Sequence, residues 1–498
     1  MTAISDRQRR GLGVQSLLFI VFLGVVFVGL ARPLIDTDLW WHLANGRYIL
    51  GHGVPSRDVY SHTALGHVWV VHEWLSDVGF YLLYQVGGLR IVLLLAAATV
   101  AAGMYMVYRL LRSGGLGNNS AVLIAMVLLV AASPSFGPRP QVLNFVLTGG
   151  LLVYLVALRR HPTHSPWRLL LLFVLWANLH SGYVVGVGLL GVFVFGEYLQ
   201  TSSRRFAGLR QEGVPPLPRP VLRRLAMVVP LGFLCGLLTP ATWRTLVFAL
   251  GTLSSSSIQS FITEWSSPDF HQPWGMALMV ILLITVGGLV AARPGADPTF
   301  LLWGLSGIAL ALTSQRHVPI FAVAAAPLVG QSASGLLAAV GLRPRVAHSP
   351  SAAAARLNMI ILVVLAVLGA VFLSLNLSTK SIDGAVAAAE PVAATDWILS
   401  HRPQRELFNE YKYGGWLVWK AGPAYPVFID GRVEVYGEAV FNEYLRTEYL
   451  TNDWQEPLKR FGINTILVTS GDRLQLLLPD HGWRLAYHDD VAQVWVRD

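Results

Sequence analysis

The sequence has 498 residues, of which 54% are hydrophobic and 13% are charged, and its mean hydropathy is +0.53. A soluble domain carries about 25% charged residues, so this composition excludes a soluble globular protein. It also excludes a disordered chain, and the single cysteine, Cys235, excludes a disulfide scaffold. The net charge of +9 is uneven, because residues 1–376 hold 25 basic and 11 acidic side chains, whereas residues 377–498 hold 12 and 17. We therefore expect a multi-pass membrane protein with two domains in different environments.

Eleven apolar stretches approach the length of about 20 residues that a membrane helix needs. They are residues 14–31, 88–108, 119–134, 141–158, 167–179, 182–199, 225–240, 274–292, 299–313, 317–332 and 357–376. Two of them are short and are expected to tilt, to extend into their flanks or to end in irregular segments. Residues 241–254 are expected to be re-entrant or interfacial, because Arg244 and the serine run 254–257 interrupt them. The first stretch resembles a signal peptide but has no convincing cleavage site, so we expect an uncleaved anchor.

The arginines indicate the orientation of these spans. With the N-terminus in the cytoplasm, 18 of the 25 arginines before residue 377 fall in cytoplasmic loops and 7 fall outside, in agreement with the positive-inside rule. Eleven spans then place the C-terminus outside. We therefore expect a plasma-membrane protein with an extracytoplasmic C-terminal domain. Membrane topology explains the arginines, so nucleic acid is not an expected partner.

The predicted architecture is a mainly α membrane bundle, residues 1–376, followed by a small extracytoplasmic α/β domain, residues 377–498. The first outer loop, 32–87, is rich in Trp, Tyr and His and suits interfacial helices. A second long outer loop covers 241–273. In the tail, residues 426–429, 464–468 and 491–496 resemble strands, while 391–400, 438–450, 454–461 and a segment that begins at Gly414-Gly415 indicate helices.

Two carboxylates, Asp36 and Asp38, come directly after the first span at the expected outer interface. With one residue between them they can converge on a divalent cation, or act as one general base and one metal ligand or orienting group. The alternative is a solvated helix end in an aromatic belt. Glu264, in the second long outer loop, would be a second carboxylate for the same chemistry and a further metal ligand. Mg²⁺ or Mn²⁺ is the one cofactor that we expect.

Positive side chains also lie in expected outer turns. Arg139 is the only charge in the turn between the third and fourth spans, and Arg316-His317 ends the turn before the span 317–332. A guanidinium suits bidentate contact with phosphate, so we expect Arg139, Arg316 and His317 to bind a donor phosphate. The alternative for the arginines is a helix end whose side chain snorkels to the interface.

Further polar residues are expected near the same face. His42 and Glu73 lie in the first outer loop, and Asn178 and His180 end the fifth span. Polar groups at membrane depth need partners or a wet cavity, so these four are expected to bind substrate, with polar helix packing as the alternative. In the tail, Asp430-Gly431-Arg432 is either a turn closed by an Asp430–Arg432 interaction or a contact to acceptor or donor.

Carboxylates and histidines thus gather on the expected outer face, whereas the expected inner loops carry arginines and turn residues. This pattern suits the transfer of a group from a lipid-linked phosphate donor that stays in the bilayer. Arginines would hold the phosphate, while a carboxylate would deprotonate the acceptor or hold a divalent ion.

At these residues the sequence resembles GT-C type glycosyltransferases, polytopic membrane proteins that use polyprenyl-phosphate sugars. In that class a catalytic acidic residue follows the first span in a long outer loop, where this chain has Asp36 and Asp38. The run Asp38-Leu39-Trp40-Trp41-His42 is similar to the first-loop motif of oligosaccharyltransferase catalytic subunits. Ile262-Thr263-Glu264 is similar to their short loop motif that ends in Glu.

The tail segment Asn409–Trp416 is similar to the Trp-Trp-Asp-Tyr-Gly segment of those subunits, which implies that Tyr411 and Tyr413 bind substrate. It lacks the Asp of that segment, and Arg139 stands where those subunits have a second Asp-x-Asp motif. The chain also resembles a group of bacterial membrane proteins of uncertain function with Asp-x-Asp-x-Trp-Trp-His and Phe-Ile-Asp-Gly-Arg motifs.

The resemblance implies a hexosyl- or pentosyltransferase that moves sugar from a polyprenyl-phosphate donor to a glycan, lipid or protein acceptor in the cell envelope. Its partners would be that donor, the acceptor and the membrane lipids. Two alternatives stay open: a non-catalytic envelope scaffold with the same fold, and a lipid or solute transporter, which should show broken helices and often inverted repeats.

Overall fold

A computed structural model gives the fold and describes residues 11–252, 263–291, 295–342 and 350–498. Of the residues named above, the serines 254–257 and Ile262 lie outside these ranges, as do six of the cytoplasmic-loop arginines counted there: Arg7, Arg9, Arg10, Arg293, Arg343 and Arg345.

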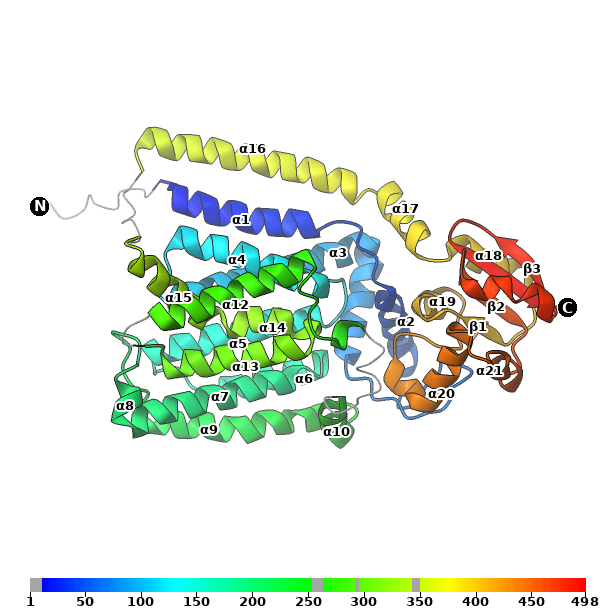
Figure 1. The fold of residues 1–498 in the computed structure, drawn as a ribbon, viewed down its shortest axis with the longest axis horizontal. Coiled ribbons are helices and arrows are strands. Elements are labelled where there is room, and N and C mark those ends of the chain that lie inside the picture. The colour runs from blue at the N-terminus through cyan, green and yellow to red at the C-terminus, as the bar shows by residue number, and fades with distance from the viewer. Residues whose placement is uncertain (1–10, 253–262, 292–294, 343–349) are drawn as a thin grey trace, which may run out of the picture.

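Most of the described chain is a bundle of apolar helices whose axes are roughly aligned (Figure 1). The helices are α1 (Val14–Leu30), α3 (Trp74–Ser113), α4 (Asn118–Ala132), α5 (Val142–Arg160), α6 (Arg168–Leu179), α7 (Tyr183–Ser202), α9 (Arg219–Leu234), α12 (Pro273–Ala291), α13 (Pro298–Thr313), α14 (Val318–Ala324), α15 (Ala326–Ala339) and α16 (Ala352–Asn376). Three further helices lie at the ends of the bundle: α2 (Thr37–His52), α8 (Arg204–Ala207) and α10 (Trp243–Thr252).

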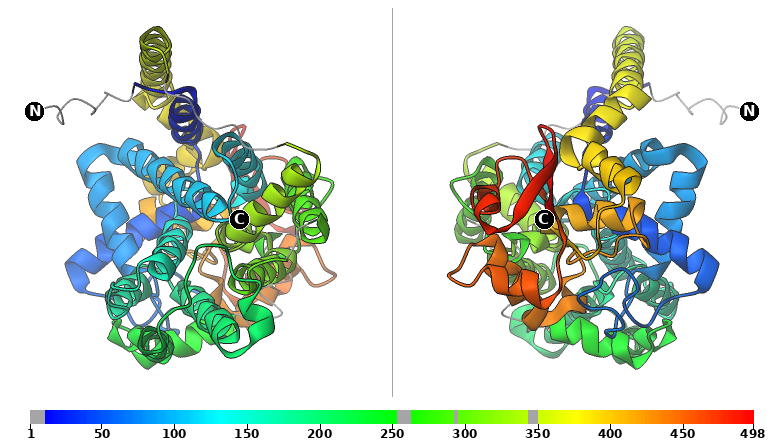
Figure 2. Two further views of the ribbon diagram at one scale, coloured as in Figure 1. Left: turned by 90° about the vertical axis from the view of Figure 1, so that its left-hand side faces the viewer. Right: turned by 90° about the vertical axis from the view of Figure 1, so that its right-hand side faces the viewer.

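Among the described residues, seven helices are long and apolar enough to cross a membrane, and the bent pair α14–α15 makes an eighth unit. The shorter apolar helices α1, α6 and α13 complete a set that coincides with the eleven predicted spans. The chain is therefore a multi-pass membrane protein with a mainly α fold, as predicted. Figure 2 shows α16 beside α1 at one edge of the bundle, and most of α16 is exposed, as expected for a helix that faces lipid.

Two helices depart from straight spans for identifiable reasons. Residues 317–332, predicted as one span, bend by 64° between α14 and α15, where Pro327 lacks the N–H that would continue the helix. In α3 the kink is at Gly87 and Gly88, and Gly88 has a φ of 62°, which favours glycine. The part of α3 before this kink belongs to the first loop, so the predicted start of the second span at residue 88 agrees with the structure.

The tail packs its own small sheet and short helices against the first loop. Its helices are α17 (Thr379–Ala389), α18 (Val392–His401), α19 (Gly414–Lys420), α20 (Val433–Glu448) and α21 (Gln455–Arg460), and its strands are β1 (Leu407–Asn409), β2 (Thr465–Thr469), β3 (Trp483–His488) and β4 (Ala492–Arg497). The sheet order is β1-β2-β4-β3, with β1 parallel to β2 and the other pairs antiparallel.

The prediction of a strand at 426–429 was wrong, and β1 and β3 were not predicted. Val427 instead forms an isolated parallel bridge with Ser61 of the first loop: its N–H donates to the Tyr60 carbonyl at 3.0 Å, and its carbonyl accepts from the His62 N–H at 3.1 Å. The segment is extended and buried, as its composition indicates, but its backbone pairs with the first loop and not with the sheet.

One continuous hydrophobic core joins the tail to the first loop. Leu39 and Trp40 of α2 and Phe80 of α3 belong to the same buried cluster as Trp416 and Phe428 of the tail. At Gly415 a Cβ would collide with the carbonyl of Thr37, so only glycine lets α19 approach α2 this closely. The tail is therefore fixed over one end of the bundle, where the polar residues gather.

Candidate functional site

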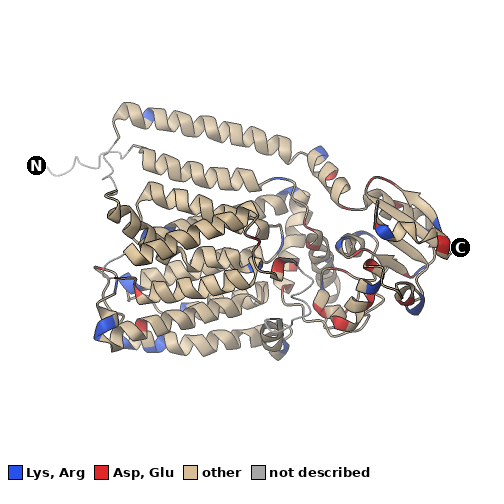
Figure 3. Cartoon of the chain, viewed as in Figure 1, with Lys and Arg blue, Asp and Glu red and all other residues tan. Residues whose placement is uncertain are grey.

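A cavity of about 210 Å³ lies where the bundle, the first loop and the tail meet. Seven of the predicted site residues line it: Asp38, His42, Glu73, Arg139, His180, Arg316 and His317. They come from five separate segments of the sequence. Figure 3 shows that the charged residues lie at the two ends of the bundle and in the tail, while the long middle of the bundle is almost free of them.

Arg139 is the centre of the first charge cluster at this cavity. Its Nε lies 3.0 Å from Asp36 Oδ2, its Nη1 lies 2.9 Å from Asp38 Oδ2, and its Nη2 contacts Glu264. Asp36 also caps α2 by accepting the Asp38 N–H at 3.0 Å. The three carboxylates therefore converge, as expected, but they converge on a guanidinium.

Close backbone approach builds this cluster. At Gly137 a Cβ would collide with Asp36 Oδ2, so glycine brings the turn that carries Arg139 against the start of α2. The Arg139 side chain is 13% exposed, and the carboxylates hold its pKa above the ordinary value although burial opposes this. Arg139 is thus fixed and largely neutralised, so a phosphate would have to compete with carboxylates for it.

Arg316 is the less engaged cation. Its side chain is 29% exposed, lies 3.9 Å from Glu264 Oε2 and stacks 5.4 Å from the centre of the Trp265 ring. Ser314 Oγ donates to the Glu264 carbonyl at 3.0 Å and so ties the two turns together. Among the described residues, Arg316 is the better placed of the two arginines for an anion that enters the cavity.

Glu73 is the centre of a second cluster, which three histidines surround. The Nε2 atoms of His180, His72 and His42 lie 2.9, 3.5 and 3.6 Å from its carboxylate oxygens. His180 Nδ1 accepts the Gly182 N–H at 2.8 Å, so the proton of a neutral His180 is on Nε2, facing Glu73.

The protonation of this cluster follows from its contacts. Burial opposes a charge on His72, but the Glu73 carboxylate raises the pKa of His72 to about 9. Burial alone would raise the pKa of Glu73, but His72 and His180 hold it well below the ordinary value. Glu73 is therefore an anion beside a cationic His72, and its charge is already satisfied.

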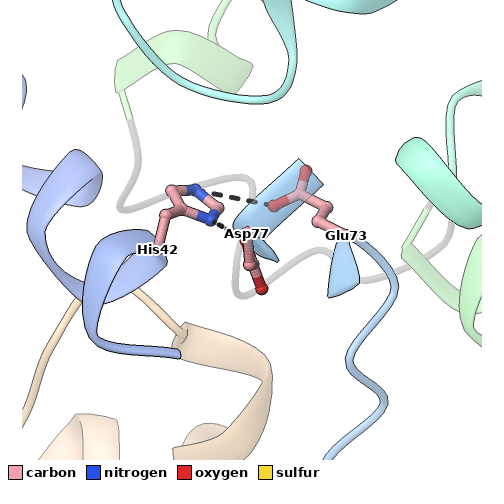
Figure 4. Close-up of side chains that lie close together, drawn as sticks. All are labelled: His42, Glu73 and Asp77. Atoms are coloured by element: carbon pink, nitrogen blue, oxygen red, sulfur yellow. Dashed lines mark hydrogen bonds and ion pairs between the residues drawn. The ribbon is translucent and has the colours of Figure 1, made fainter. Parts of the chain in front are cut away.

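His42 lies between Glu73 and Asp77, as Figure 4 shows. Asp77 Oδ1 is 2.7 Å from Nδ1 of His42 and Glu73 Oε2 is 3.6 Å from Nε2, while Asn45 donates to Asp77 Oδ2 at 2.6 Å. Ligand atoms of the three residues lie within 4.8 Å of one another, as a metal site requires. The two carboxylates face opposite nitrogens of one ring, however, and this geometry fits an imidazolium between two anions better than one ion.

Neither group of carboxylates therefore matches a divalent cation in this arrangement. Around Arg139 the guanidinium takes the place where an ion would sit, and around His42 the ring itself stands between the carboxylates. The predicted role of Asp36, Asp38 and Glu264 as metal ligands stays a prediction.

The turn Asp430-Gly431-Arg432 forms the tail side of the cavity through its glycine. At Gly431 a Cβ would collide with Asp38 Oδ1. Asp430 and Arg432 themselves are fully buried. Arg432 Nη2 donates to Asp430 at 2.6 Å, and Nη1 donates to Asp58 at 2.7 Å. The expected substrate contact by these two side chains is wrong for this arrangement, because burial removes both from the cavity; they close the turn instead.

The remaining predicted residues lie outside the cavity lining. Asn178 accepts from Trp74 Nε1 at 2.8 Å and donates to the Val174 carbonyl, which is polar helix packing. Tyr413 is buried and its hydroxyl donates to the Val491 carbonyl at 3.0 Å. Asp36, Glu264 and Tyr411 also do not line the cavity, although the first two hold Arg139.

The predicted site does not include four residues found here: His72, which the sequence favoured as a structural hydrogen-bonding residue, and Asp77, Asn144 and Glu434. His72 adjoins Glu73, and Asp77 follows Glu73 by one helical turn, so helical spacing could have indicated both. Glu434 follows the Asp-Gly-Arg turn by two residues, but nothing in the sequence shows that it faces a cavity. Asn144, which lies 2.9 Å from His180 Nδ1, gives no signal in the sequence.

Comparison with solved structures identifies the fold. The oligosaccharyltransferase of Archaeoglobus fulgidus, solved with a tethered acceptor peptide that contains the NVT sequon, matches with a TM-score of 0.52 and 10% identity over 97% of this chain and 74% of its own. The same organism's AglB, in complex with an inhibitory peptide and a dolichol-phosphate, gives 0.51 and 9% over the same shares.

The arabinofuranosyltransferase AftD from Mycobacteria matches with a TM-score of 0.51 and 13% identity over 100% of this chain and 40% of its own. No family model and no curated protein sequence matches the chain. The structural likenesses show a GT-C-like membrane fold, which confirms the fold predicted from the sequence.

Proposed function

We propose that this protein with a GT-C-like fold is a glycosyltransferase that moves a sugar from a polyprenyl-phosphate donor to a cell-envelope acceptor outside the membrane. The observation that supports this most strongly is the cavity itself. It joins the cation Arg316, with the imidazole of His317 beside it, to the carboxylate of Asp38 at the end of an apolar bundle. A lipid tail can lie along such a bundle while its phosphate reaches the polar end.

The donor phosphate belongs on the bundle side of the cavity. Arg316 is partly exposed there, with His317 next to it, and Arg139 lies behind. A guanidinium binds phosphate oxygens through two parallel hydrogen bonds, and it stabilises the negative charge that grows on the leaving phosphate. The A. fulgidus AglB, which has the same fold, was solved with a dolichol-phosphate.

The reaction in this proposal is a direct displacement. The acceptor hydroxyl oxygen attacks the anomeric carbon, the bond from that carbon to the phosphate oxygen breaks, and the electron pair leaves with the polyprenyl phosphate. A carboxylate takes the hydroxyl proton. Of the predicted pair Asp36 and Asp38, only Asp38 lines the cavity, so it is the better candidate for a role at the reacting sugar, as base or as holder of a cation.

A transfer assay tests this function. The wild type, Asp38→Asn, Asp36→Asn and Arg316→Ala are purified into lipid nanodiscs and given radiolabelled polyprenyl-phosphate sugars with cell-envelope acceptor fractions. We expect the wild type to transfer label, Asp38→Asn to lose about 10²-fold or more of the rate, and Arg316→Ala to bind donor more weakly. If Asp38→Asn and Arg316→Ala both match the wild type, the proposed assignment of this cavity is wrong.

Transport is the alternative with one observation in its favour, the broken helix α14–α15. The break is fully packed, because Ala322, Ala324 and Ala326 are buried there. Transporter sites at broken helices instead expose half-helix ends and carbonyls to a substrate. The polar cavity lies at the end of the bundle, which favours transfer chemistry at the interface.

A further inference from the structure

The tail contributes one carboxylate to the cavity, Glu434 in the first turn of α20. Its side chain is half-buried and lines the same cavity as Asp38, His72 and Glu73. Among the described residues it forms no ion pair and no side-chain hydrogen bond to another residue, although the charge of His72 acts on it.

The other carboxylates around the cavity are engaged with cations. Asp38 pairs with Arg139 and also accepts from Trp41 Nε1 at 3.3 Å. Glu73 faces three histidines. Asp36 and Glu264 form ion pairs with Arg139 and do not line the cavity. A carboxylate whose lone pairs already bind a guanidinium is a weak proton acceptor. Glu434 is therefore the cavity carboxylate whose oxygens are open to a ligand.

The chain holds Glu434 in place through a buried anchor two residues earlier. Arg432 is fully buried, pairs with Asp430 and with Asp58 of the first loop, and packs against the rings of Tyr60 and Trp69, whose centres lie 4.9 and 4.6 Å from its guanidinium. This anchor fixes the turn from both domains. Gly431 then fits against Asp38, and Glu434 faces the cavity.

We propose that Glu434 is the general base of the transfer reaction and that the tail domain thereby completes the active site. This inference rests on the proposed glycosyltransferase function. A Glu434 oxygen accepts the proton of the acceptor hydroxyl as that oxygen bonds to the anomeric carbon, and the carbon–phosphate oxygen bond breaks with its electron pair on the phosphate. Asp38 is then not the base. Its role is the other one proposed for it, to hold a positive charge beside the sugar, as it does with Arg139.

The surroundings of Glu434 suit this task. Burial raises the pKa of its carboxyl above the ordinary value, although His72 opposes this. A base is most effective when its pKa lies closer to the working pH while it is still ionised. The acceptor would enter from the tail side and the lipid phosphate from the bundle side, so that the sugar is held between them.

The test separates base chemistry from binding and folding. Wild type, Glu434→Gln, Glu434→Asp and Glu434→Ala are compared in nanodiscs, with Glu456→Gln as the matched control, because Glu456 is an exposed tail glutamate outside the cavity lining. Undecaprenyl phosphate is the binding probe, and radiolabelled polyprenyl-phosphate sugars are the donors. Sodium formate is added to Glu434→Ala to replace the missing carboxylate.

We expect Glu434→Gln to bind undecaprenyl phosphate within about twofold of the wild type while transfer falls about 10²-fold or more. Glu434→Asp should keep part of the rate, formate should restore part of the rate of Glu434→Ala, and Glu456→Gln should equal the wild type. Because formate cannot repair a folding defect, its rescue identifies base chemistry even if Glu434→Gln folds poorly.

Two results would overturn the assignment while the proposed function stands: Glu434→Gln transferring within threefold of an active wild type, or Glu434→Ala losing donor binding and transfer equally with no effect of formate. A wild type that neither binds undecaprenyl phosphate nor transfers sugar would overturn the proposed function and, with it, the role of Glu434.

Discussion

The two ends of the bundle carry the same kinds of side chain in different states. At the end away from the tail, Arg159 pairs with Glu197 at 2.9 Å and with Asp297 at 2.7 Å, and Arg210 completes the group. These two carboxylates are fully buried and Arg159 is 1% exposed. At the tail end, the side chains of Asp38, Glu264 and Arg316 are 24–29% exposed, and Asp38 and Arg316 line a cavity.

This difference separates a structural ion network from a candidate site. The far network has two arginines and two carboxylates, so its charges balance and no side chain is available to a ligand. Among the described residues, the tail end keeps a partly exposed cation, Arg316, and a carboxylate that forms no ion pair, Glu434. Arginine next to carboxylate is therefore not a sign of function by itself; accessibility and incomplete pairing are.

The largest expected effect comes from breaking the far network. Arg159→Met leaves Glu197 and Asp297 buried without their shared cation, which costs about 3–5 kcal/mol of folding free energy. Thermal unfolding in detergent measures this, with the exposed neighbour variant Arg160→Met as control. An unfolding temperature equal to that of Arg160→Met would contradict a structural role for the network.

At the tail end we expect a loss of binding and little loss of stability, because the Arg316 side chain is 29% exposed and contributes little to folding. Arg316→Ala should weaken undecaprenyl phosphate binding by about 10-fold to 100-fold, because a hydrogen bond to a charged group contributes about 1.5–3 kcal/mol. Its unfolding temperature should stay within a few degrees of the wild type. Arg244→Ala, an exposed arginine outside the cavity lining, is the binding control, and equal affinities of the two variants would refute this role.

The sequence predicts the positions of the helices better than it predicts the contacts at the two ends of the bundle. Hydropathy alone located the apolar helices at the eleven predicted positions, because a run of about twenty apolar residues is typical of a membrane helix. It could not show that Asp36, Asp38 and Glu264 meet on Arg139, since that contact joins three distant segments. The expectation that the inner loops carry only arginine and turn residues missed Glu197 and Asp297, whose charges are visible in the sequence but whose pairing with Arg159 is not.

The tail shows the same limit. Burial and extension of 426–429 were visible from its apolar residues, but the partner strand was not, because backbone pairing with residues 60–62 depends on how the tail docks. Glu434 was missed for the same reason, since its neighbours His72 and Asp38 come from the first loop.

A smaller effect is expected from pH, through His72. Its folded-state pKa of about 9 lies above the ordinary value of 6.5, so its stabilisation is complete below pH 6.5 and is lost as the pH rises through 9. The unfolding temperature of the wild type should therefore fall by a few degrees between pH 7 and pH 10. His72→Gln should remove this part of the decrease, whereas exposed His52→Gln should retain it. Identical pH profiles of the two variants would contradict the His72–Glu73 pair.

The smallest effect is expected on metal removal. Because Arg139 and the His42 ring take the places between the carboxylates, EDTA should change transfer by less than about twofold. Transfer that EDTA abolishes and that Mg²⁺ or Mn²⁺ restores would show that Arg139 moves aside and that the predicted metal role of Asp36, Asp38 and Glu264 is correct.

The most direct measurement is a cryo-EM structure of the full chain in nanodiscs with undecaprenyl phosphate. We expect the phosphate within hydrogen-bonding distance of Arg316, in the cavity beside Asp38 and Glu434, with the isoprenoid chain along the apolar helices. A phosphate bound at the Arg159 end, or an occupied site that leaves the tail-side cavity untouched, would contradict the assignment of this cavity to donor binding.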